Sequence, residues 1–221
     1  EAIVVDVSKP AELDRLAKDV FAKHGAVRLL VNAGIETIGF TWDIPIERWE
    51  ATLNINIHGV IHGVRAFVPY MLKSGQECWI GNLASIGGFS QMPTQTAYIV
   101  TKHAVEAFSE CLFLEMDVAK APIHVSSIIP GMVKTRIFDA DAGDGEPGAA
   151  AKHRKVMHDM MAAYGMDLDE GCRRIVAQMA ENKFWVSTQP EMTADTLAGR
   201  IDFLKNQSAP KLADQARQLL E

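Results

Sequence analysis

Three residues between positions 85 and 102 have the types and spacing for proton transfer. Tyr98 follows Ser85 by 13 residues, and Lys102 follows Tyr98 by four. Residues four apart share one side of a helix, and an ammonium next to a phenol favours the phenolate. This predicts a lowered pKa for Tyr98. With Ser85 holding a carbonyl or alcohol oxygen, the trio suits alcohol oxidation or carbonyl reduction, with hydride moving to or from a cofactor.

The alternative for this trio is purely structural. The chain has three tyrosines, so one of them stands four residues before a lysine by chance quite easily. Tyr98 would then be a packed ring and Lys102 a solvated amine. The choice between the two interpretations depends on whether other polar residues gather at the same place.

The elements that would position these residues alternate along the chain. Apolar runs of strand length alternate with segments of helical periodicity. The predicted strands span 2–5, 27–31, 78–83, 123–129 and 183–187, and the predicted helices span 8–24, 46–73, 97–119 and 169–181. The first helix is expected to begin with Ser8 as its cap and Pro10 in its first turn.

The predicted fold class is α/β. The strands show no alternation with polar residues, so we expect helices to cover both faces of the sheet. Alternating strands and helices predict a Rossmann-type doubly wound parallel sheet, in three αβα layers and a single domain over residues 1–221.

Polar or glycine-containing segments follow four of the predicted strands. They are Asp6, Asn32-Ala33-Gly34, Ser85 and Pro130-Gly131. Because the carboxyl ends of parallel strands meet at one edge of a sheet, these segments are expected to converge there. Such convergence favours a functional site over chance.

Two segments after position 136 differ from the rest in composition. Residues 139–151 are rich in glycine and acidic residues, which predicts a loop. Residues 157–166 are rich in methionine and predict an adaptable helix. The segment 137–166 would either pack on the domain or form a lid over an apolar substrate.

Charge and cysteine content limit the classes of partner. The net charge is −6 and the pI is near 5.7, which argues against nucleic acid or an anionic membrane as a main partner. No apolar run approaches the ~20 residues that span a bilayer. Three widely spaced cysteines predict reduced thiols and a cytoplasmic location.

Two other kinds of site are disfavoured. His58 and His62 lie four apart, but no glutamate stands between them in the metalloprotease pattern and no third ligand is evident. We therefore predict no metal site. A serine hydrolase is disfavoured because the Gly-x-Ser-x-Gly elbow is absent.

Five motifs in order resemble the short-chain dehydrogenase/reductase family. They are Asp6-Val7 after a strand, Asn32-Ala33-Gly34, Asn56-Ile57-His58-Gly59, Ser85 with Tyr98-Ile-Val-Thr-Lys102, and Pro130-Gly131-Met132-Val133-Lys134-Thr135. Each motif is weak by itself, but five in the family's order across the whole chain are strong.

The resemblance implies roles for these residues. Tyr98 would be the general acid/base, Lys102 would lower its pKa and bind the nicotinamide ribose, and Ser85 would orient the substrate oxygen. Asn56 would hold a proton-relaying water. The implied NAD or NADP site comprises Asp6, Val7, Asn32, Ala33, Gly34, Tyr98, Lys102, Pro130, Gly131, Val133 and Thr135.

The residues around the trio predict a substrate class, and the resemblance implies an assembly. Apolar residues around the trio predict an apolar or aromatic secondary alcohol or ketone. The predicted substrate contacts are Ile86, Gly87, Phe89, Met92 and Met132. In this family, helices such as 46–73 and 97–119 form a homodimer or homotetramer interface, and we expect the same here.

One departure from the family leaves a second function open. The family begins with a strand, a glycine-rich turn and a helix that bind the pyrophosphate, and the chain resembles a member without this first βαβ portion. The sequence GIETIG, 34–39, follows a different strand. The main hypothesis is an NAD(P)-dependent alcohol dehydrogenase or carbonyl reductase. The alternative is a non-catalytic fragment or scaffold that cannot bind the dinucleotide.

Overall fold

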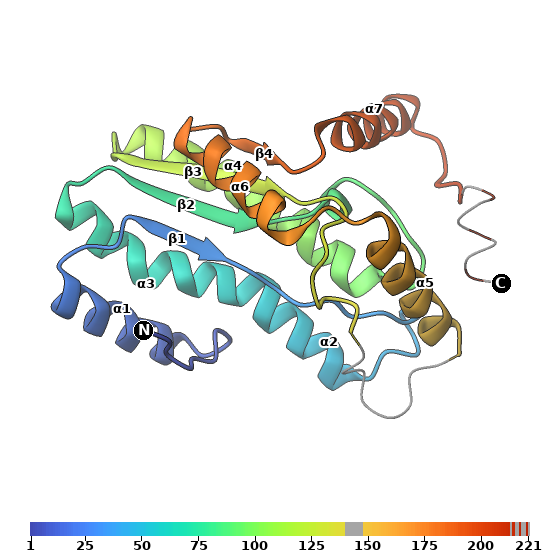
Figure 1. Ribbon diagram of the computed structural model, residues 1–221, viewed down its shortest axis with the longest axis horizontal. Coiled ribbons are helices and arrows are strands. Elements are labelled where there is room, and N and C mark those ends of the chain that lie inside the picture. The colour runs from blue at the N-terminus through green and yellow to red at the C-terminus, as the bar shows by residue number, and fades with distance from the viewer. Residues whose placement is uncertain (140–147, 213, 215–216, 218–219, 221) are drawn as a thin grey trace.

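The chain folds around a parallel β-sheet (Figure 1). A computed structural model describes residues 1–139, 148–212, 214, 217 and 220. The sheet of the described residues has four strands in the order β1-β2-β3-β4, with bounds Leu29–Asn32, Cys78–Leu83, Ile123–Ile129 and Trp185–Ser187. All neighbouring strands are parallel, so their carboxyl ends share one edge. The α/β class and the parallel sheet are confirmed.

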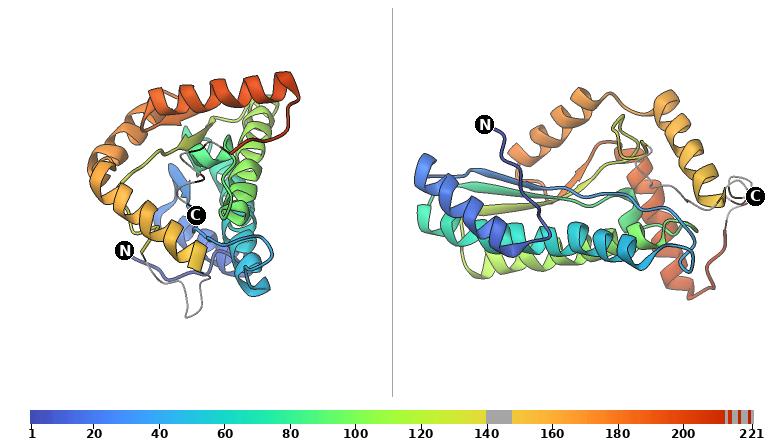
Figure 2. Two further views of the ribbon diagram at one scale, coloured as in Figure 1. Left: turned by 90° about the vertical axis from the view of Figure 1, so that its right-hand side faces the viewer. Right: turned by 90° about the horizontal axis from the view of Figure 1, so that it is seen from below.

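Helices cover both faces of this sheet and give three layers (Figure 2). Helices α1, α3 and α4 pack on one face, and α6 packs on the other. The helical segments are α1 (Pro10–His24), α2 (Ile46–Leu53), the π-helical η1 (Asn54–His58), α3 (Gly59–Ser74), the 3-10 turn η2 (Ile86–Gly88), α4 (Thr96–Val118), α5 (Gly148–Tyr164), α6 (Leu168–Ala180) and α7 (Pro190–Asn206).

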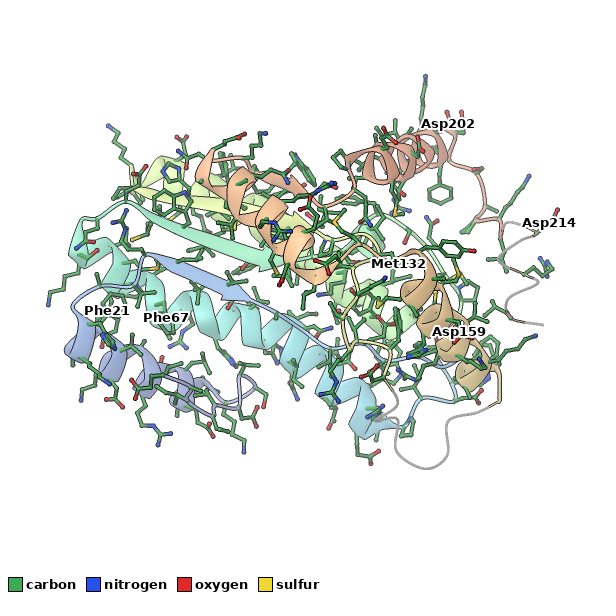
Figure 3. The ribbon with its side chains drawn as sticks, in the orientation of Figure 1. Phe21, Phe67, Met132, Asp159, Asp202 and Asp214 are labelled. Carbon is green, nitrogen blue, oxygen red and sulfur yellow. The ribbon has the colours of Figure 1, made fainter. Side chains whose placement is uncertain are left out.

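The larger core lies between α1, α3, α4 and the sheet. Phe21 of α1 and Phe67 of α3 pack with their ring centroids 6.3 Å apart (Figure 3). Met71, Ile80 and Val125 of the same cluster are 0%, 0% and 1% exposed. Burying a side chain of this size contributes about 1.5–3 kcal/mol, so this layer fixes α3 and α4 against the sheet.

A smaller apolar cluster lies beyond the carboxyl ends of the strands. Phe138, Ala150 and Met161 are buried in it with Ile38, and Met157 packs at its side. The cluster joins α5 to the loop that follows β1. Met132 lies between the sheet and α5 (Figure 3). The Met-rich segment therefore does pack on the domain, through α5.

The predicted strand at residues 2–5 is wrong. These residues form no strand, and Ile3 and Val4 are 51% and 99% exposed. A strand needs a neighbour to bond its backbone groups, and no described segment pairs with residues 2–5. The four apolar residues at 2–5 do not indicate which segment would pair with them.

The predicted cap of the first helix is also wrong. Lys9 occupies the cap position of α1 and makes no side-chain cap. The Ser8 hydroxyl instead donates to Oδ1 of Asp6 at 2.7 Å, and the Ser8 amide donates to the same atom at 3.0 Å. The Ser8 hydroxyl therefore bonds within the turn before α1 and does not cap the helix.

Strand β1 is not covered on both faces as predicted. Leu29 and Val31 are each 47% exposed, while the alternate residues face α3. Helix α6 packs on β4 and on Trp79 and Leu83 of β2, and among the described residues it leaves this side of β1 open. Whether a strand face is covered depends on how far the neighbouring helix extends across the sheet. The composition of the strand alone does not indicate this.

Three other boundaries differ from the predictions. The helix predicted over 46–73 is interrupted by the π-helical turn η1 at Asn54–His58. Helix α5 begins at Gly148, so the predicted loop at 139–151 ends earlier, and its residues 140–147 lie outside the described residues. Helix α7 was not predicted, although Pro190 in its first turn is a usual start signal.

Candidate active site

A cavity of about 260 Å³ opens at the carboxyl ends of β2 and β3. Its inner wall, as we call it, comes from the loops after β1 and β2 and from α4, and comprises Gly34, Glu36, Ser85, Gln95, Tyr98 and Lys102. Its outer wall comes from the loop after β3, from α5 and from α7, and comprises Met132, Ile137, Phe138, Met157, Met161 and Met192. The strand ends thus converge at one edge, as the topology predicts.

Ser85 follows the end of β2 and occupies the N-cap position of η2. Its hydroxyl accepts a hydrogen bond from the Gly87 amide at 3.0 Å, which caps the 3-10 turn. A hydroxyl that accepts this bond still has its own proton to donate toward the cavity. Gly87 gives the ring of Tyr98 room, because a Cβ there would lie 3.3 Å from Cε1 of that ring.

Tyr98 and Lys102 lie one turn apart on α4, as their spacing predicts. The Lys102 Nζ lies 5.2 Å from the centroid of the Tyr98 ring and donates to the Leu83 carbonyl at 2.7 Å. Lys102 is 4% exposed, so its amine is held inside the inner wall. The alternative of a solvated amine is therefore wrong.

The pKa of Tyr98 departs in the direction opposite to the prediction. Burial raises it above the usual phenol value, and Glu36 raises it further, while Ser85 lowers it. Burial also lowers the pKa of Lys102 to about 8, against the attraction of Glu36 and Glu106. Desolvation thus outweighs the attraction between ammonium and phenolate in the cavity as it stands, and Tyr98 keeps its proton at neutral pH.

Asn56 joins the loop after β1 to α4. Its Oδ1 accepts from the Ile35 amide at 2.8 Å, and its Nδ2 donates to the Ile35 carbonyl at 2.8 Å and to Oγ1 of Thr101 at 3.0 Å. Asn56 lies within the π-helical turn, a distortion that is frequent at functional sites. The amide therefore holds Ile35, the residue after Gly34, from both sides.

Gly34 lies where no side chain fits. A Cβ on Gly34 would lie 2.5 Å from Oδ1 of Asn56 and 3.3 Å from Nζ of Lys102. The Asn56 amide cannot move aside without losing its bonds to Ile35. The glycine of the Asn-Ala-Gly motif thus keeps backbone open to the cavity next to Lys102.

Only part of the predicted dinucleotide site lines this cavity. Gly34, Tyr98 and Lys102 do so, together with Pro130, Gly131, Val133 and Thr135. The loop after β3 is held by the Gly131 amide, which donates to Oγ1 of Thr188 at 3.1 Å, and by Gln189, which donates to the Met132 carbonyl at 2.8 Å.

The remaining predicted dinucleotide contacts lie elsewhere. The Asn32 amide donates to Oδ1 of Asn82 at 2.9 Å across the sheet, and Ala33 is exposed. Asp6 is exposed and bonded to Ser8, and Val7 packs against Gly59, where a Cβ would lie 2.9 Å from its Cγ2. None of these four residues is among the lining of this cavity, so their contact with a dinucleotide stays a prediction.

Of the predicted substrate contacts, some line the cavity and others do not. Ile86, Gly87 and Met132 line the cavity. Phe89 and Met92 do not: the Phe89 ring packs on Trp185 with centroids 5.5 Å apart, and the Met92 carbonyl accepts from the Gln95 amide. The chain stays beside the cavity, because Ser90 between them is a lining residue, so sequence proximity to Ser85 does not tell which side chains reach the cavity.

Several residues that line the cavity belong to none of the five motifs. Glu36 and Gln95 are polar members of the inner wall, and Met192 comes from the unpredicted α7. Glu36 could have been suspected, since it stands two residues after the Asn-Ala-Gly motif. Nothing in the sequence points to Gln95 as its partner.

The two histidines of α3 and η1 have other contacts. Nδ1 of His58 lies 2.8 Å from Oδ1 of Asn54, and Nδ1 of His62 lies 3.2 Å from the Val7 carbonyl. Across the described ranges, no three His, Cys, Asp or Glu residues are grouped closely enough to hold a metal ion. Within the same ranges, no helix has both the length and the apolar character needed to cross a membrane.

Comparisons with known proteins match this chain to one family. The family described as short chain dehydrogenase matches residues 1–144. An uncharacterized oxidoreductase of Staphylococcus saprophyticus is 35% identical over 153 residues, which cover 69% of this chain and 62% of that protein. The probable oxidoreductase EphD of Mycobacterium bovis is 34% identical over 146 residues, which cover 66% of this chain and 24% of that protein. The chain thus spans less than two thirds of the length of these relatives.

Solved structures agree in fold. A short chain dehydrogenase/reductase from Burkholderia phymatum, solved in complex with NAD, superposes with a TM-score of 0.89 at 27% sequence identity. The superposition covers 96% of this chain and 78% of that one.

Proposed function

The chain belongs to the short chain dehydrogenase family, and on that premise we propose that it is an NAD(P)-dependent oxidoreductase interconverting a secondary alcohol and a ketone. The observation that carries the proposal is the shared cavity of Ser85, Tyr98, Lys102 and Gly34 with the loop after β3. NAD bound in the structure from Burkholderia phymatum supports a dinucleotide here. The dinucleotide would supply the hydride acceptor or donor.

The residues of the cavity fit a flat ring of such a group. Gly34 and Gly131 line the cavity with backbone alone, and Lys102 stands beside Gly34. Gly34, Lys102, Pro130, Gly131, Val133 and Thr135 are the residues that would hold the nicotinamide end. The fit depends on the absence of a side chain at position 34.

In this proposal Tyr98 moves the proton and Ser85 orients the oxygen. During reduction, the Tyr98 hydroxyl gives its proton to the substrate oxygen as hydride reaches the carbonyl carbon. A raised pKa suits this direction, because Tyr98 is then protonated at neutral pH. Lys102 would stabilise the phenolate that remains, and Ser85 would donate to the same oxygen.

We assign Asn56 a positioning role within the same reaction. Its amide bonds to Ile35 and Thr101 fix the loop of Gly34 against α4. The predicted relay water stays a prediction. Asn56 thereby keeps Gly34 and Lys102 at a constant separation.

The substrate is proposed to be apolar or aromatic, and the assembly a homo-oligomer. Methionines, Ile137 and Phe138 of the outer wall support the first proposal. Val100, Phe113, Leu114 and Val118 of α4 are at least 41% exposed, which supports an interface along this helix. Light scattering of the purified protein tests it, and a monomeric mass at micromolar concentration would contradict it. That the segment 137–166 acts as a lid stays a prediction.

The test combines cofactor binding with one substitution. NADH and NADPH are titrated into the protein, and saturable binding of either is expected. Tyr98→Phe is expected to lower turnover of a ketone panel by about 10²–10⁴-fold, because proton transfer is lost, while the melting temperature stays unchanged. Saturable binding without turnover, or full activity of Tyr98→Phe, would contradict the proposal. Absence of any binding would favour the scaffold alternative.

A further inference from the structure

Glu36 is a carboxyl group on the polar inner wall of the cavity, opposite an outer wall of methionines, Ile137 and Phe138. It is 9% exposed and lines the cavity together with Gln95. The Gln95 side-chain amide donates to Oε1 of Glu36 at 3.1 Å. None of the motifs accounts for this pair.

The backbone on both sides of Glu36 is firmly held. The amide and carbonyl of Ile35 are both bonded to Asn56. On the other side, the Thr37 and Thr52 hydroxyls lie 2.6 Å apart, and the Gly39 amide donates to the Thr94 carbonyl at 2.7 Å. The carboxyl is therefore placed before any substrate enters, which is what recognition of a polar group needs.

The charges around Glu36 decide what it recognises. Burial raises the pKa of Glu36 to about 8, although Gln95, Arg154 and Lys102 each act to lower it. At neutral pH the group is therefore mostly a carboxylic acid, which both donates and accepts hydrogen bonds. With Gln95 beside it, the wall offers donors and an acceptor without a formal charge.

We propose that Glu36 and Gln95 bind a hydroxyl group of the substrate, distinct from the oxygen that reacts at Tyr98. The inference rests on the proposed function, because it takes this cavity to be the place where the ketone binds. The substrate class is then an apolar, hydroxyl-bearing ketone and its alcohol. Glu36 and Gln95 are specificity-determining residues in this assignment.

Charged substrate groups fit the pair less well. A substrate ammonium would meet Arg154 and Lys102, whose positive charges act on Glu36. A substrate carboxylate would be attracted by the same cations, but it could take only the single acid proton of Glu36, which leaves acceptor oxygens facing each other with no proton between them. A hydroxyl group avoids both conflicts and pairs with a donor and an acceptor at once.

The experiment measures affinity without turnover. Acetophenone and its three ring-hydroxylated derivatives, which are isomers of one another, are titrated into the wild-type chain. The same titrations are made with Glu36→Gln, Glu36→Met and Gln95→Met. Glu47→Met, on the exposed face of α2, is the control. We expect the wild type to bind at least one hydroxylated isomer about tenfold more tightly than acetophenone, as one or two buried hydrogen bonds allow.

The variants then separate the pair from the apolar wall. Glu36→Met is expected to abolish the preference, measured as the ratio of the two affinities, while Glu36→Gln keeps most of it. If no isomer binds more tightly than acetophenone, or if the preference survives in both Glu36→Met and Gln95→Met, the inference is overturned. A preference found in a chain that reduces no ketone would instead overturn the proposed function and leave this inference standing.

Discussion

The inner and outer walls of the cavity are built from different interactions. On the inner wall, Ser85, Lys102 and Glu36 are each tied by a hydrogen bond to a neighbour. On the outer wall, Met157, Met161 and Phe138 meet through apolar contact. A hydrogen-bonded wall keeps its geometry only with all partners present, whereas methionines adjust to the shape of a ligand. Under the proposed function, the chemistry belongs to the inner wall and tolerance of substrate shape to the outer wall.

Removing the amine of the inner wall is the strongest way to test this comparison. We expect Lys102→Met to lower kcat/KM by about 10²–10³-fold, because the phenolate at Tyr98 loses its nearby cation and the Leu83 carbonyl loses its donor. Steady-state kinetics measures this. Lys73→Met, at an exposed position of α3, is the control and should leave kcat/KM unchanged.

Filling the space at Gly34 should have the next largest effect. In Gly34→Ala the new methyl group would lie 2.5 Å from Oδ1 of Asn56. We expect a loss of about 1–3 kcal/mol in the free energy of unfolding and a fall of about tenfold in kcat/KM. Gly199→Ala meets nothing within 4 Å and serves as control. Equal behaviour of the two variants in urea unfolding would show that the inner wall is not tightly set.

A buried acid beneath the inner wall should give a pH-dependent stability. Glu106 is 4% exposed, and its Oε2 accepts from the Ser127 hydroxyl at 2.7 Å. Burial raises its pKa from 4.5 to about 7. An acid whose pKa is raised by folding contributes its full stabilisation at pH values below its pKa in the unfolded state. This stabilisation is lost as the pH rises through its pKa in the folded state.

The free energy of unfolding should therefore decline between pH 5 and pH 8. We expect Glu106→Gln to reduce this decline by about 1–3 kcal/mol, while Glu115→Gln at an exposed position of α4 leaves it unchanged. Glu36, whose pKa burial raises to about 8, adds to the decline in both proteins, and Lys102, whose pKa burial lowers to about 8, titrates at the upper edge of this window. Parallel unfolding curves for the wild type and Glu106→Gln across this range would contradict the expectation.

The smallest effects are expected on the outer wall. Met157→Leu conserves volume but removes flexibility, so stability should change by less than about 1.5 kcal/mol. The ratio of kcat/KM for large and small ketones should shift about two- to fivefold, mostly through KM. Met160→Leu on the same helix is the control, because Met160 is not among the lining residues. A loss as large as that of Lys102→Met would erase the distinction between the walls.

The inner wall was more predictable from the sequence than the outer wall. Tyr98 and Lys102 share a helix face because of local geometry, and Ser85 reaches them because β2 ends beside α4. Phe89 and Met92 follow Ser85 closely in the chain, yet neither lines the cavity, whereas Ser90 between them does. Met192 enters from a helix that starts over fifty residues after Met132. Local spacing therefore predicts residues on one element and fails for residues that converge from several.

By itself the sequence determined the α/β class, the parallel sheet and the grouping of Ser85 after β2 with Tyr98 and Lys102 on α4, because these follow from periodicity and short-range spacing. Only the tertiary structure decided the pKa of Tyr98, the partner of Glu36 and the lack of a strand at residues 2–5. The physical reason is the same in each case. Desolvation, side-chain partners and strand pairing depend on groups that are distant in the chain and meet only after folding.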